Sequence, residues 1–172
     1  MDAPAKPFLD VVAGRPLSWT QPERARASWE VKAGDEVIAK IARRRWYGPT
    51  LRIESHSDTW DAVMTWTGFA LRRPGEKVPV IKYRSMLFAR GRLWLGEEEL
   101  LWRGQFHWFR RMSYELQSAS ETPMIRVLPR FEPLRYQGDL EITDFGKRHR
   151  QIEPLLVFSV ALALFSHRRR AH

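Results

Sequence analysis

The segment IEPLLVFSVALALFSHRRRAH near the C-terminus constrains the fold more than any other part of the sequence. All residues from Leu155 to Phe165 are apolar except Ser159, and a triplet of arginines follows. As a helix, this run would be about 16 Å long, whereas the hydrocarbon core of a bilayer is about 30 Å thick. The run favours burial on all sides within the protein over a transmembrane span or a surface helix.

The same run predicts a helix near residues 154–166. Pro154 suits the first helical position. Glu153 and the arginine triplet stand at the ends where their charges complement the helix dipole. The run is also longer than most strands. A strand stays an alternative, because Val157 and Val160 tolerate an extended backbone.

The remainder of the chain predicts strands rather than helices. SWEVKA at 28–33 alternates apolar and polar residues, and Gly34 and Asp35 then form a turn signal. EVIAKIA follows and places Val37, Ala39 and Ile41 on one face, which predicts a hairpin. Similar runs recur roughly every 8–12 residues, a spacing typical of an all-β sandwich or barrel. About ten to twelve strands are expected.

Together, these features predict a mainly β protein with a closed antiparallel β-barrel around a central hydrophobic C-terminal helix. Closure of the sheet surrounds the apolar helix and also pairs both sheet edges. Residues 1–16 contain three prolines and little pattern, so they are expected to form a flexible N-terminal tail. Residues 17–172 are expected to form a single barrel domain.

The order of these features resembles the superfamily of tubby-like, LURP-one-related and phospholipid scramblase-like proteins. LSWTQP (17–22) resembles the opening strand of small bacterial members, GDEVIAKI (34–41) a strand of the first hairpin, and PLLVFSVALAL (154–164) the closing helix. The resemblance implies a barrel threaded by its helix, and binding of phospholipid headgroups. The chain lacks cysteine and an acidic calcium loop. The resemblance therefore does not imply lipid scrambling. No phosphoinositide-binding residue of the family can be transferred by position.

Signals for catalysis are weak. The five histidines show no metal-ligand spacing, and no nucleophile-elbow, phosphate-loop or dinucleotide motif is present. His56, Ser57 and Asp58 are adjacent in a turn, whereas a catalytic triad converges from separate parts of a fold. The sequence therefore predicts a protein that is not an enzyme and uses neither a cofactor nor a metal.

Clusters of basic residues are the strongest functional signal. The formal net charge is +9, and arginine forks match the geometry of phosphate groups. A solvated basic surface without a ligand is the alternative interpretation. The candidate anion-binding and headgroup-binding residues are Arg43, Arg44, Arg45, Trp46, Lys147, Arg148, Arg150, Arg168, Arg169 and Arg170.

The sequence therefore suggests a binding module for anionic phospholipid headgroups or membrane surfaces. Each cation near an anionic membrane contributes about 1 kcal/mol, so several clusters must share one face for useful binding. A nucleic-acid-binding barrel and a structural domain that binds a protein partner are the alternatives. The N-terminus has no signal-peptide pattern, which predicts a cytoplasmic protein that is not secreted, with peripheral attachment at the inner membrane face.

Overall fold

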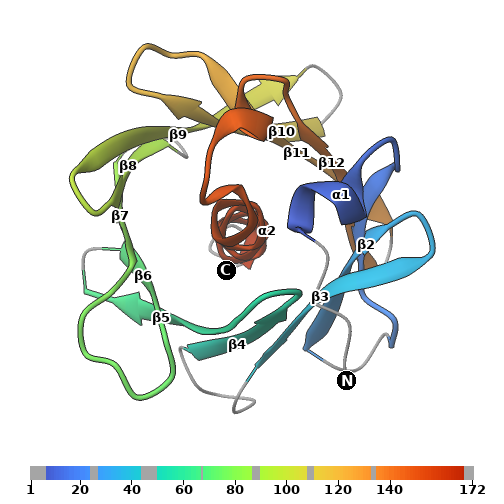
Figure 1. The fold of residues 1–172 in the computed structure, drawn as a ribbon, viewed down its shortest axis with the longest axis horizontal. Helices are drawn as coiled ribbons and strands as arrows, with labels where there is room; N and C mark the ends of the chain where they lie inside the picture. Colours follow the sequence, from blue (N-terminus) through green and yellow to red (C-terminus); the bar gives the residue numbers. More distant parts are fainter. Residues whose placement is uncertain are drawn as a thin grey trace.

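Twelve antiparallel strands form one closed barrel, and a long helix runs through its centre (Figure 1). The computed structural model describes residues 7–23, 27–43, 50–66, 68–86, 90–107, 111–132 and 135–168. The strands are β1 (Leu17–Thr20), β2 (Ser28–Ala33), β3 (Glu36–Arg43), β4 (Thr50–Ser55), β5 (Thr59–Thr65), β6 (Gly68–Arg72), β7 (Ile81–Ser85), β8 (Arg90–Leu95), β9 (Glu98–His107), β10 (Arg111–Ser118), β11 (Pro123–Glu132) and β12 (Arg135–Ile142). The predicted fold class is confirmed.

Alternating side chains explain why the strands close around a core. In β2, Trp29, Val31 and Ala33 are buried, and in β4 Leu51 and Ile53 are buried. Successive side chains of a strand point to opposite faces, so one face of each strand lines the interior. Each strand pairs with its neighbours in the chain, and β1 pairs with β12. Both edges of the sheet are therefore paired.

Ion pairs link strands on the outer face of the barrel. The guanidinium of Arg126 on β11 lies 3.0 Å from Glu115 on β10 and 3.1 Å from Glu141 on β12. Hydrogen bonds to Glu141 and then to Glu115 raise the pKa of Arg126 above its ordinary value. These pairs connect three neighbouring strands through groups that also remain in contact with water.

A β-bulge corrects one detail of the predicted first hairpin. Val31 pairs with Ala39, but the next residue, Lys32, pairs with Val37, so Ile38 is an extra residue in β3. The bulge reverses the alternation on either side of it. Ile38 is therefore buried, while Val37, expected on the inner face, is 38% exposed.

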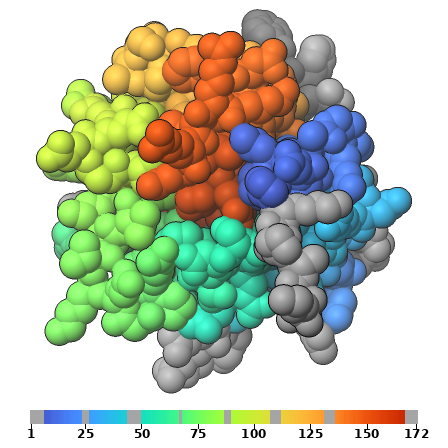
Figure 2. All heavy atoms as spheres, viewed as in Figure 1, coloured from blue at the N-terminus to red at the C-terminus, as the bar shows by residue number. Residues whose placement is uncertain are grey.

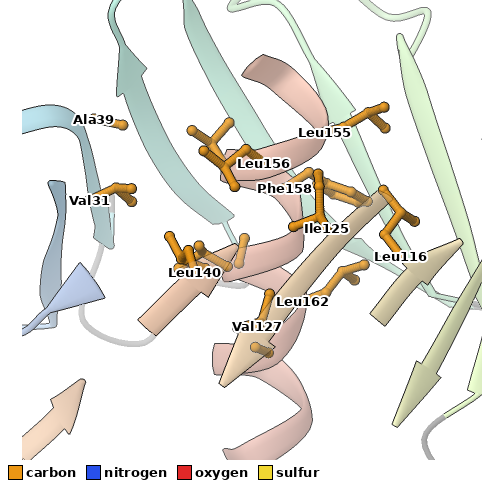
Figure 3. Close-up of a cluster of buried hydrophobic side chains, with 14 of the residues drawn as sticks. Val31, Ala39, Leu116, Ile125, Val127, Leu140, Leu155, Leu156, Phe158 and Leu162 are labelled. Carbon is orange, nitrogen blue, oxygen red and sulfur yellow. The ribbon is translucent and has the colours of Figure 1, made fainter. Parts of the chain in front are cut away.

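Helix α2 (Ile152–Arg168) occupies the barrel interior. It begins two residues before the predicted start, so Pro154 is the third helical residue rather than the first. That position is still in the first turn, where a missing N–H leaves no helical hydrogen bond unmade. The lone hydroxyl of the apolar run, on Ser159, donates to the Leu155 carbonyl at 2.8 Å. All residues of the run are buried, several of them against β10, β11 and β12 (Figure 3).

A short helix, α1 (Phe8–Val12), lies within the segment expected to be a flexible tail. Phe8, Val11 and Val12 are buried and belong to the hydrophobic core. Helix α1 lies at one end of the barrel beside α2 (Figure 1). From residue 7 onward, the structure thus differs from the expected tail, and residues 1–6 lie outside the described residues.

Candidate functional site

The two ends of the barrel carry different turns and different side chains. We call the end where α2 begins the proximal mouth and the end where it ends the distal mouth. Strand directions alternate, so the turns β2–β3, β4–β5, β6–β7, β8–β9 and β10–β11 lie at the proximal mouth. Helix α1 and the short helix η1 (Gly146–Arg148) lie there too, and Figures 1 and 2 both view this mouth.

Acidic residues are spread around the proximal mouth. Each of the five turns there carries at least one acid, and so does the connection from β12 to η1. Because the turns of an antiparallel barrel are divided between its ends, residues far apart in the chain gather in one ring. These acids include Asp35, Asp58, Glu76, Glu97, Glu121 and Asp144.

The structure separates the predicted basic residues into two groups. Lys147, Arg148 and Arg150 lie at the proximal mouth, where they line a groove beside the start of α2. Arg43 ends β3 and Arg168 ends α2, both toward the distal mouth. The two groups therefore do not share one face. The other predicted residues, Arg44, Arg45, Trp46, Arg169 and Arg170, lie outside the described residues.

Large apolar side chains are exposed along one part of the distal mouth. Trp66 is fully exposed, Phe106 is 70% exposed, and Met64 and Met86 are also exposed. They belong to β5, the β5–β6 turn, the end of β7 and β9, so they are spread over the five consecutive strands from β5 to β9. With Arg84 and Arg90, which lie between them, we call these six residues the distal rim.

The backbone explains why Trp66 and Phe106 reach into solvent. Thr65 pairs with Gly68, so Trp66 stands in the tight turn between two paired residues and faces no neighbouring strand. Phe106 lies three residues beyond Arg103, the partner of the first residue of β8. At about 3.3 Å per residue, β9 thus extends about 10 Å past the end of β8. Phe106 is therefore held on strand backbone, and Trp66 in the turn that joins β5 to β6.

The distal rim is connected to the central helix. Met64 pairs with Phe69 of β6, and the Phe69 ring stacks on Phe165 of α2 with 4.2 Å between the ring centroids. Phe69 also stacks on Tyr83 of β7. The exposed side of the rim therefore rests on a packed aromatic layer that ties β6, β7 and α2 together.

Two exposed arginines accompany the apolar residues. Arg84 lies on β7, where it pairs with Gly68, and Arg90 begins β8. The N–H of Met86 donates to the Arg90 carbonyl at 2.7 Å and closes the β7–β8 connection. Cations and large apolar side chains are thus both exposed at this mouth. Arg43, the predicted residue at the end of β3, adds a further cation to the same mouth.

The distal rim was not predicted from the sequence. Trp66, Met86 and Phe106 stand in runs interpreted as strands, and a strand pattern does not distinguish a buried aromatic side chain from one past the end of its neighbour. One local signal existed: Trp66 lies two residues before Gly68, in a turn-forming sequence. The exposure depends on strand register, which the sequence does not specify.

Comparison with known proteins found no match to this chain among protein-family models, curated proteins or solved structures. Within the described residues, no helix is long and apolar enough to cross a membrane. No group of three or more His, Asp or Glu side chains in the described part of the chain is placed to hold a metal ion.

Proposed function

We propose that this protein binds the surface of anionic phospholipid membranes through its distal rim, as a non-enzymatic module at the inner membrane face. The observation that supports the proposal most is the exposure of Trp66, Phe106 and Met86 at one mouth of the barrel, together with two exposed arginines. Aromatic residues prefer the membrane–water interface, and arginines beside them attract anionic headgroups. The resemblance to tubby-like and scramblase-like proteins points to the same class of ligand.

The magnitudes favour the apolar contribution over the charges. Removing a large apolar side chain from water contributes roughly 1.5–3 kcal/mol, whereas a cation near the membrane contributes about 1 kcal/mol. Trp66 and Phe106 would thus outweigh Arg84 and Arg90. Binding should therefore persist at physiological salt, because salt screens the charges and leaves the apolar contribution in place.

The ring of acids supports an orientation. Acids of the proximal turns, among them Asp35, Glu76 and Glu97, repel an anionic membrane. They also offset cations at the same mouth, among them Lys77, Arg148 and Arg150. The distal rim contributes arginines and apolar side chains instead. The barrel would therefore stand with its distal mouth against the membrane and its proximal mouth toward the aqueous phase.

Flotation with vesicles tests the proposal. Purified protein should float with vesicles of phosphatidylcholine and phosphatidylglycerol, at low and at physiological salt. It should float less with phosphatidylcholine alone, and this difference should be larger at low salt. Phe106→Ala should weaken binding roughly tenfold or more, since the lost burial of about 1.5–3 kcal/mol corresponds to that change. Trp66→Ala should have an effect of similar size.

The matched control is Phe145→Ala, because Phe145 is also an exposed phenylalanine but lies next to η1 at the proximal mouth. It should float as well as the wild type. Equal loss in both phenylalanine variants would contradict the orientation. Binding that disappears at physiological salt and transfers to single-stranded nucleic acid would favour the alternative, in which arginines bind phosphates and aromatic rings stack on bases.

A further inference from the structure

The proximal mouth contains a groove that is separate from the distal rim. It has a volume of about 690 Å³ and lies between α1, the β4–β5 turn, the β6–β7 connection and the chain from η1 to α2. In Figure 2 these segments meet near the middle of the face, in blue, teal, green and red-orange. The volume falls within the range of about 300–1,000 Å³ that is typical of small-molecule sites.

One cation of the groove is fixed by an acid. The Nε of Arg73 donates to Asp58 at 3.1 Å, and its guanidinium lies 5.7 Å from the centroid of the Trp60 ring. Asp58 also accepts the N–H of Thr59 at 2.8 Å. The charges of Arg73 and Asp58 therefore compensate each other, and the Arg73 guanidinium lies over Trp60.

Two further charged groups of the groove, one cation and one acid, are held by hydrogen bonds. Lys147 donates to Asp144 at 2.8 Å, and this hydrogen bond, with a smaller effect from Arg148, lowers the pKa of the Asp144 carboxyl. Asp144 thus stays ionised at neutral pH and offsets Lys147. The buried carboxylate of Glu153 accepts the N–H of Ser57 at 2.8 Å, which ties α2 to the β4–β5 turn.

Arg148 and Arg150 are the remaining cations of the groove, and of the two Arg148 has a weak charge interaction with Asp144. Both are exposed, and neither guanidinium has an ion-pair partner among the described residues. The residue between them is fixed: His149 Nε2 lies 2.9 Å from Glu98, and its Nδ1 accepts the N–H of Gln151 at 3.2 Å. The backbone that carries the two arginines is therefore anchored to β9.

The groove also has apolar lining residues. Phe8 and Leu9 of α1 and Val80 before β7 line it, and Pro154 borders it at the first turn of α2. Phe8 belongs to the packed core, so this surface is preformed rather than assembled around a ligand. A small apolar body can lie here while an attached anion reaches the arginines.

We propose that the proximal groove binds a small amphipathic organic phosphate, with its phosphate on Arg148 and Arg150 and its apolar part on the α1 side. Arginine forks bind phosphate oxygens in pairs, and the neighbouring acids are already engaged with Arg73, Lys147 and Ser57. The site does not depend on membrane binding by the distal rim, because it lies at the other mouth.

Calorimetry with hexyl phosphate as the probe tests this site. Hexyl phosphate should bind saturably. Hexanol lacks the phosphate and inorganic phosphate lacks the apolar chain, so each should bind at least roughly tenfold more weakly than hexyl phosphate. Arg148→Ala combined with Arg150→Ala should weaken hexyl phosphate binding by about tenfold or more. Lys82→Ala, which removes an exposed cation from the outer face of β7, should leave it unchanged.

No saturable binding, equal affinity for inorganic phosphate, or an unchanged affinity of the double arginine variant would overturn the proposal. Vesicle flotation separates this site from the proposed membrane surface. The double variant should float like the wild type, and Phe106→Ala should still bind hexyl phosphate. Loss of flotation in the double variant would assign the groove to lipid headgroups and overturn both the separate ligand and the distal orientation.

Discussion

Leu162→Glu is expected to prevent folding of the barrel. Leu162 is 1% exposed and lies in the middle of α2, among side chains of the central core (Figure 3). Losing a buried leucine costs about 2–5 kcal/mol. Keeping a buried carboxyl neutral at pH 7 adds about 4 kcal/mol, since its ordinary pKa is about 4.3 and each unit costs about 1.4 kcal/mol. The sum is comparable to the whole stability of a domain, about 5–15 kcal/mol.

Soluble expression and circular dichroism during heating measure this effect. The variant should be insoluble or show no cooperative transition, whereas Leu162→Ala should fold with a lowered Tm. Val37→Glu is the matched control, because it introduces the same charge at an apolar residue that the β3 bulge exposes. It should melt close to the wild type. A wild-type Tm for Leu162→Glu would contradict the burial of α2 inside the barrel.

The central helix could be predicted because its constraint is local and strong. An apolar run without a polar face requires an apolar environment on every side, and Leu155–Phe165 is too short for a bilayer. The alternation of apolar and polar residues predicted the strands. For β2, the predicted bounds 28–33 agree with the structure. The closed barrel satisfies both patterns, since it buries the helix and one face of each strand.

The candidate site could not be predicted in the same way, because it depends on which turns share an end of the barrel. Arg43 and Lys147 look alike in sequence, yet strand direction places them at opposite mouths. Phe106 looks like a core residue, yet β9 extends past β8 and exposes it. A single inserted residue at Ile38 is likewise enough to reverse the faces of β3. The number of residues in each strand and the register between strands decide which mouth and which face a side chain reaches.

Gly68→Ala is expected to have the second largest effect on stability, although the change adds one methyl group. A Cβ at Gly68 would lie 2.0 Å from the Tyr83 carbonyl oxygen and 3.1 Å from the Cα of Arg84. Both are backbone atoms of β7, so no side-chain rotation can relieve the contact. The strands β6 and β7 must separate, and overpacking of this kind costs about 3 kcal/mol. Chemical denaturation measures that loss.

The matched control is Gly96→Ala at the proximal mouth. Gly96 has φ +61°, and a Cβ added there would meet no atom within 4 Å, so its cost of about 1–2 kcal/mol is conformational rather than steric. Gly68→Ala should also weaken vesicle flotation, because Trp66 stands in the turn that Gly68 closes. Gly96→Ala should not. If Gly68→Ala is as stable as the wild type and floats normally, the close approach of β6 and β7 does not hold the distal rim in place.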